Sequence, residues 1–133
     1  MTPQREEAER FLRLARRDQA GFAALLGAPG VDLALACFHA QQAAEKTLKS
    51  VMCLHGLEYR RTHDLEELAA KLTAAGFPPP ISEAQFSRLT PYAVEFRYDD
   101  ETIHLITGTE AAQLISTLLA WADNQLRTDA EHE

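Results

Sequence analysis

Arg97 and His104 are the two residues whose types and spacing best suit chemistry at a phosphodiester. Cleaving RNA without a metal needs a base for the ribose 2′-hydroxyl, an acid for the leaving oxygen and positive charge for the developing phosphorane. Histidine suits both proton transfers because its unperturbed pKa is about 6.5. Arginine suits the phosphate because its planar fork donates two parallel hydrogen bonds and stays charged. The pair is therefore the candidate catalytic site of this sequence.

The separation of seven residues sets how such a pair could act. On one helix, Arg97 and His104 would lie within about 20° of the same face but about 10.5 Å apart along the axis, which is far for a single phosphate. A two-fold dimer can instead bring Arg97 of one subunit toward His104 of the other, so the chemistry would require dimerisation. The alternative is structural: Arg97 pairs with Asp99, Asp100 or Glu101, and His104 is an ordinary histidine near a loop. Those carboxylates would also repel RNA unless they point outward.

A second set of polar residues recurs at helical spacing: His39, Gln42, Lys46 and Lys49. They predict a polar strip on one helix, which could contact RNA or a protein partner. The alternative is a solvated face, in which Glu45 and Lys49 form a surface pair worth only about 0.2–0.5 kcal/mol.

Other candidate sites have weaker support. His63 and Asp64 could form a dyad, but adjacent helical residues point about 100° apart, which favours a capping or packing role. Cys37 and Cys53 are sixteen residues apart in apolar surroundings, as is typical of buried thiols rather than of a metal or redox pair. The five histidines lack metal-ligand spacing, and no glycine-rich phosphate loop is present, so we expect neither a metal nor a cofactor.

Length and composition set the broad class. A chain of 133 residues with 46% apolar residues fits one domain. Its formal charge of −7 opposes unspecific binding to nucleic acid, so any RNA contact should be local. Neither an eighteen-residue apolar run nor a secretory signal is visible, and we expect a cytoplasmic protein without a membrane partner.

The apolar pattern predicts five helical segments with short connections, and hence an all-α, antiparallel up-and-down bundle of four to five helices. The domain should span residues 1–127, with a polar tail at 128–133. The first helix should begin at Thr2 and Pro3, and the second should run from about 32 to 55. Thr62 should cap the third helix, and Thr109 the last.

Four further expectations concern this bundle. Ser82 and Gln85 form a capping box that begins the fourth helix, and Pro91 should kink that helix or end its first half. Ala36, Ala40 and Ala44 should lie at a close helix contact. Five short helices cannot bury all of their apolar positions within one subunit, which also predicts a dimer. The positions left to be covered are Phe86, Leu89, Tyr92 and Phe96.

Three short motifs together resemble one family. The segment 38–49, FHAQQAAEKTLK, resembles the second-helix signature of HEPN domains, and THDL at 62–65 resembles the next family element. Arg97-Tyr98 with His104 matches the family pattern of an arginine, four to six residues and a histidine. The resemblance covers about residues 5–125, and the three motifs occur in the family's order.

This resemblance implies an antiparallel bundle that dimerises, with the arginine and histidine of two subunits around one cleft. Many such proteins look like metal-independent ribonucleases and toxins, encoded beside a minimal nucleotidyltransferase that serves as antitoxin. Others resemble non-catalytic helical modules that bind a nucleotidyltransferase or a nucleotide. Tyr98 departs from the small polar residue that commonly follows the arginine, and it joins the polar strip as a candidate for RNA or partner contact. Two hypotheses are therefore compatible with the sequence: a dimeric endoribonuclease and a binding module.

Overall fold

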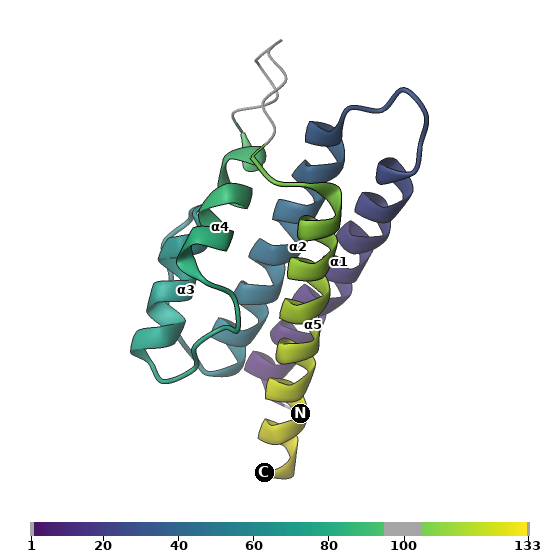
Figure 1. Cartoon of the computed structure of the whole chain (residues 1–133). Coiled ribbons are helices and arrows are strands. Elements are labelled where there is room, and N and C mark those ends of the chain that lie inside the picture. The colour runs from purple at the N-terminus through teal and green to yellow at the C-terminus, as the bar shows by residue number, and fades with distance from the viewer. Residues whose placement is uncertain (1, 95–104, 133) are drawn as a thin grey trace.

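The computed structural model describes residues 2–94 and 105–132, and within these ranges it is built from helices without strands. The predicted all-α class is confirmed, and the bundle is shown in Figure 1. The helices are α1 (Pro3–Leu26), α2 (Leu33–Leu54), α3 (Leu65–Ala74), α4 (Glu83–Leu89), the short 3₁₀ helix η1 (Thr90–Ala93) and α5 (Gly108–Glu131).

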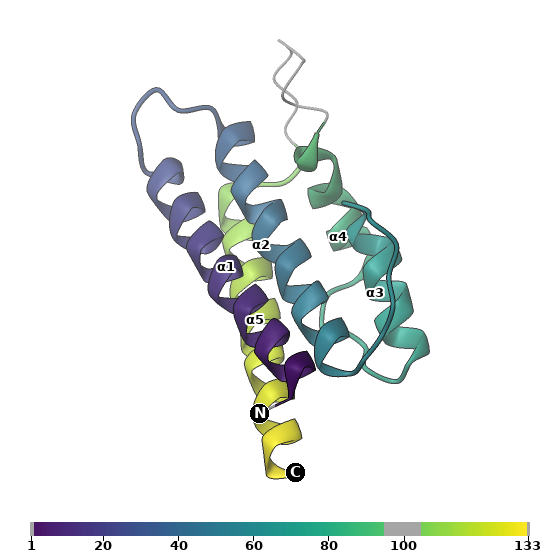
Figure 2. The same ribbon diagram turned by 180° about the vertical axis from the view of Figure 1, so that it is seen from behind.

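Helix α2 forms the centre of the bundle, because it contacts α1, α5, α3, α4 and η1. Figures 1 and 2 show α1 and α5 beside it on one side, and α3 and α4 on the other. Ala36, Ala40 and Ala44 are fully buried, as predicted. The approach of α1 to α2 is close enough for the Ser50 hydroxyl to donate to the carbonyl oxygen of Ala8 at 2.6 Å. Small side chains on both helices allow this distance.

Two predicted helix starts were wrong by two residues. Asp64, not Thr62, caps α3, since its carboxylate accepts the backbone N–H of Glu67, while the Thr62 hydroxyl accepts only the N–H of Asp64. Thr107, not Thr109, caps α5. Its hydroxyl accepts the N–H of Glu110, and the Glu110 carboxylate accepts the N–H of Thr107. This capping box explains the choice, because only Thr107 has a glutamate three residues later.

The other predicted helix ends are confirmed. Ser82 and Gln85 form the capping box of α4, and Thr2 caps α1 through the N–H of Arg5. The second helix ends before Gly56, whose φ of +67° is a left-handed conformation that glycine adopts without strain. Pro91 lies in η1, so the chain changes from α to 3₁₀ geometry there, as expected for a helix that ends at its proline.

The burial argument for a dimer was wrong. Phe86, Leu89 and Tyr92 are at most 1% exposed within a single chain, because α4 and η1 fold back onto α2 and α3. They need no second subunit to cover them. Phe96, the fourth residue of that argument, lies outside the described residues.

The C-terminal end is helical through residue 131, so α5 includes most of the segment expected as a polar tail. The Arg5 guanidinium donates to the carbonyl oxygen of Leu126 at 3.0 Å and pairs with Asp129 at 3.3 Å. These contacts tie the start of α1 to the end of α5, which lie at one end of the bundle in Figure 2. None of the helices within the described ranges combines the length and the apolarity that a membrane crossing requires.

Candidate functional site

The segment 95–104 carries the predicted catalytic pair, Arg97 and His104, together with Tyr98, and it lies outside the described residues. The backbone N–H of Leu105 donates to the hydroxyl oxygen of Tyr92 at 3.0 Å, and Tyr92 and Ile106 are both buried. The two flanks of the segment therefore meet at one end of the bundle, where η1 ends and α5 begins.

The polar strip of α2 occupies the one side of this helix that is partly open to solvent. His39, Gln42, Lys46 and Lys49 are all half-buried, while the positions that alternate with them are almost all buried. The structure thus places the four predicted residues on one side of α2. It also shows that they are not simply solvated, because each of them is bound to a neighbour.

On the α1 side, the strip is bound by one carboxylate. Asp18 accepts a hydrogen bond from the Lys46 ammonium and lies 3.2 Å from Nδ1 of His39. Asp18 is half-buried between the two helices, so its charge is matched where α1 and α2 meet. His39 and Lys46 therefore hold α1 in register as well as facing solvent.

On the α3 side, the strip is bound to a buried carboxylate that the sequence placed on the surface. Glu45 is 5% exposed, and its Oε2 accepts from the Lys49 ammonium at 2.9 Å. Its Oε1 lies 2.7 Å from Nδ1 of His63. Gln41, fully buried, donates at 2.9 Å to the backbone oxygen of His63. A buried carboxylate is costly unless it is paired and hydrogen-bonded, and Glu45 has both kinds of partner.

His63 is the chemically most versatile member of this cluster. Its side chain remains 55% exposed although its Nδ1 faces Glu45. Glu45 occupies Nδ1 of this ring, so Nε2 is the ring nitrogen that remains available to a ligand. The sequence analysis missed this pair because it tested His63 against its neighbour Asp64, and the true partner is eighteen residues away.

Two carboxyl groups lie close together at the start of α3. Burial and a hydrogen bond with Asp64 raise the pKa of Glu66 to about 7. The same hydrogen bond, with backbone N–H donors of α3, lowers the pKa of Asp64. The Thr90 hydroxyl donates to Glu66 at 2.9 Å and links this pair to η1. Glu66 can therefore hold a proton near neutral pH.

The family model "HEPN domain" matches residues 4–122. The chain belongs to the HEPN family. A solved structure described as ST0689, an archaeal HEPN homologue, is similar at 22% identity, covering 92% of this chain and 94% of that chain with a TM-score of 0.44. The comparison with curated proteins gave no match.

Two of the motifs behind the HEPN assignment are in direct contact. The motif on α2 supplies Gln41, Glu45 and Lys49, and the motif before α3 supplies His63 and the capping Asp64. The pairing of Glu45 with His63 therefore joins two sequence motifs of this HEPN chain into one structural unit.

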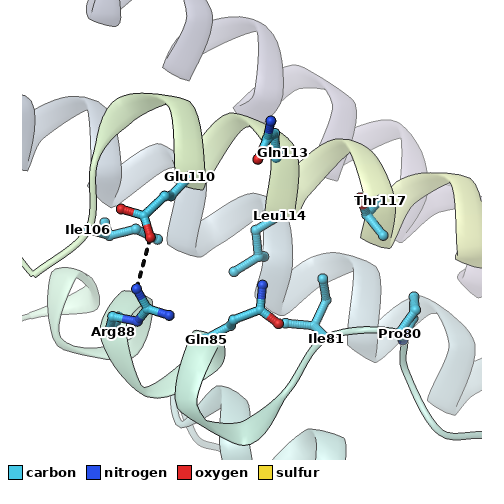
Figure 3. A pocket seen from close by; sticks show the side chains of 9 residues that line it. All are labelled: Pro80, Ile81, Gln85, Arg88, Ile106, Glu110, Gln113, Leu114 and Thr117. Carbon is cyan, nitrogen blue, oxygen red and sulfur yellow. Dashed lines mark hydrogen bonds and ion pairs between the residues drawn. The ribbon is translucent and has the colours of Figure 1, made fainter.

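A separate pocket of about 300 Å³ lies between α4 and α5 (Figure 3). Arg88 and Glu110 pair across it at 2.8 Å. Gln85 also lines it, but its side-chain oxygen accepts the N–H of Ser82, just as Glu110 accepts the N–H of Thr107. Much of the polar lining thus consists of helix caps, so we assign this HEPN pocket a structural role.

The two cysteines of this HEPN bundle differ in how deeply they are buried. Burial raises the pKa of Cys37 to about 11, so its thiol stays protonated and is a poor nucleophile. The prediction of buried thiols is confirmed for Cys37 and only in part for the half-buried Cys53. In the described ranges, no three His, Cys, Asp or Glu residues are grouped as metal ligands.

Proposed function

We propose that this HEPN protein is a dimeric endoribonuclease that cleaves RNA without a metal ion. The observation that supports it most is the fixed position of both flanks of the Arg97–His104 segment, through the Tyr92 hydroxyl and the buried Ile106. The residues on both sides of this segment therefore lie at one end of the bundle. Two such segments from two subunits would supply the arginines and histidines of a shared cleft.

The reaction follows from the two side-chain types. Arg97 binds the scissile phosphate and stabilises the charge that develops on its oxygens. His104 serves as general base or acid, moving a proton from the ribose 2′-hydroxyl or to the leaving 5′-oxygen. The 2′-oxygen forms a bond to phosphorus as the bond to the 5′-oxygen breaks. The products are a 2′,3′-cyclic phosphate and a 5′-hydroxyl.

The partner follows from the family. HEPN proteins of this kind resemble toxins that are paired with a minimal nucleotidyltransferase, and we propose such a protein as the antitoxin of this chain. An adjacent gene for a nucleotidyltransferase would support the pairing. Rescue of a growth defect by co-expression of that gene would test it.

The direct test measures cleavage of labelled RNAs by the purified protein. The expected result is cleavage that persists in EDTA, that leaves 2′,3′-cyclic phosphate ends, and that is lost in His104→Ala and impaired in Arg97→Lys. His132→Ala, at the C-terminal end of α5, is the matched histidine control and should cleave normally. Wild-type protein that cleaves no more than His104→Ala on several RNAs would remove the ribonuclease proposal.

The second candidate function is a non-catalytic dimer that binds a nucleotidyltransferase or a nucleotide. One observation favours it: many cations in the described ranges are already paired with carboxylates, which reduces the positive charge available to RNA. The paired cations are Arg5, Arg10, Arg16, Lys46, Lys49, Arg60 and Arg88. For this function, the Arg97 and His104 variants would change partner or nucleotide affinity and leave RNA intact.

A further inference from the structure

The exposed side of α1 is unusually basic for an acidic chain. Residues 10–17 contain four arginines and no carboxylate, although the whole chain has a formal charge of −7. Arg10, Arg13 and Arg17 recur at intervals of three and four residues, so they share one side of α1, and all three are exposed. Arg13 and Arg17 take part in none of the ion pairs formed among residues 2–94 and 105–132.

This side of α1 borders the polar strip of α2. The two helices lie side by side in Figure 2, and the Lys46–Asp18 pair joins them. Gly21, one turn after Arg17 on α1, faces the ring of His39, since a Cβ added there would lie 3.5 Å from its Nδ1. We call this surface the basic face and define it by Arg10, Arg13, Arg17, Lys46 and Lys49.

Three carboxylates beside the basic face are bound to its own cations, whereas Glu6, exposed on the same side of α1, is in none of the ion pairs of the described residues. Glu7 pairs with Arg10, Asp18 with Lys46, and Glu45 with Lys49. The cations left for an external anion are therefore chiefly Arg13 and Arg17, with the remaining N–H donors of the paired ones.

Aromatic rings accompany the cations. Arg10 lies over the ring of Phe11 at 5.0 Å, and Lys49 lies over the ring of Tyr59 at 5.4 Å. Both rings are half-buried, so part of each remains at the surface. Cations beside partly exposed rings suit a single-stranded nucleic acid, whose phosphates need positive charge and whose bases stack on aromatic faces.

The basic face runs toward the end of the bundle at which α2 begins. From Lys49 to His39 the α2 strip covers about 15 Å, and the helix then continues to the part that contacts η1. The segment 95–104 follows η1 in the chain. A strand that followed the strip from Lys49 toward His39 would thus approach the end of the bundle where α2 begins and η1 lies (Figure 2).

We propose that the basic face binds the sugar–phosphate backbone of single-stranded RNA and directs it toward the segment that carries Arg97 and His104. The proposal rests on the proposed function for the choice of RNA. Charge complementarity and the adjacent rings argue for this ligand over an acidic protein, which would gain little from the rings.

The test measures binding of a labelled 2′-O-methyl oligonucleotide, which lacks the nucleophilic hydroxyl and cannot be cleaved. The double variant Arg13→Gln, Arg17→Gln removes the two unpaired arginines. Its affinity should fall about tenfold at low salt, and the salt dependence of log Kd should weaken by about one unit per lost phosphate contact. The matched control is Lys71→Gln, Arg127→Gln, which removes two exposed cations from α3 and the end of α5. The control should change affinity less than twofold.

Three results would overturn the inference. The first is an equal loss of affinity in the two double variants, which would indicate general electrostatics. The second is a polyglutamate peptide that binds with the same dependence on Arg13 and Arg17 while the oligonucleotide does not bind. The third is an unchanged KM for RNA cleavage in the Arg13, Arg17 variant, which would leave the proposed function intact. Specific binding of the oligonucleotide without any cleavage of RNA would instead support the basic face and remove the ribonuclease proposal.

Discussion

Glu45 Oε1 lies 2.7 Å from Nδ1 of His63, which joins the middle of α2 to the residue before the N-cap of α3. The loop between these helices carries Tyr59, whose ring lies under the Lys49 ammonium. Lys49 in turn pairs with Glu45. One buried carboxylate thus fixes the α2–α3 loop and one edge of the polar strip at the same time.

Replacing this carboxylate should destabilise the fold. In Glu45→Ala, Lys49 and His63 lose their charged partner and Gln41 loses a 3.3 Å contact. We expect the free energy of unfolding to fall by about 1–3 kcal/mol, less than for a fully buried pair because His63 is half exposed. Urea denaturation measures it. Glu58→Ala, an exposed glutamate in the adjoining loop, should stay within about 0.5 kcal/mol of the parent, and equal losses in both variants would contradict the role of Glu45.

The buried side of α2 gives a second prediction. Ala40 is fully buried, so Ala40→Leu must insert a larger side chain into a filled space. The expected loss is roughly 1–3 kcal/mol through overpacking. Ala120→Leu, at an exposed position of α5, is the control and should melt like the parent. A normal melting temperature for Ala40→Leu would mean that the packing around Ala40 can open at little cost.

The raised pKa of Glu66 predicts that the stability of the fold depends on pH. Its pKa is about 7 in the folded chain against an ordinary value of 4.5, so the folded state binds the proton more tightly than the unfolded state. Stability should therefore fall as pH rises from about 4.5 to about 7. Glu66→Gln keeps a donor for Asp64 and an acceptor for Thr90 but cannot ionise.

The measurement compares the two proteins by urea denaturation at pH 5 and pH 8, where the lowered pKa of Asp64 leaves it ionised throughout. At pH 5, near the start of this fall, the difference in stability between the parent and Glu66→Gln should be small. At pH 8 the variant should be the more stable, by on the order of 1 kcal/mol once solvent screening is allowed for. Glu83→Gln, an exposed glutamate of α4, should follow the parent at both values. An identical pH profile for parent and Glu66→Gln would rule out the shared proton.

The sequence predicted the local parts of this structure and missed the long-range ones. The α4 capping box and the bounds of α2 depend on residues a few positions apart, and both are confirmed. Thr107 could have been identified from Glu110 three residues later. The burial of Phe86 and Leu89 could not, because it depends on how α4 folds back onto α3, which no local pattern fixes.

For the candidate site, too, the sequence predicted the local features and missed the long-range contacts. Helical spacing placed His39, Gln42, Lys46 and Lys49 on one strip, as the structure confirms. Their partners could not be predicted, since Asp18 and His63 come from other elements and meet the strip only after the helices assemble. Arg97 and His104 remain a sequence prediction, and they are best tested by function.

The final prediction tests whether the catalytic pair is shared between subunits. The burial of Phe86, Leu89 and Tyr92 removes one reason for a dimer, so the remaining reason is the seven-residue separation of Arg97 and His104. Arg97→Ala and His104→Ala should each be inactive, while each still sediments as a dimer at micromolar concentration. If each site takes its arginine from one subunit and its histidine from the other, a mixed dimer contains one intact site. Refolding or co-expressing the two variants in equal amounts makes half of the dimers mixed, and activity should return to about a quarter of the parent's. Two catalytic residues from one chain would give no recovery, because neither subunit of the mixed dimer has both. A monomer in sedimentation, or a mixture as inactive as its components, would exclude a site shared between subunits.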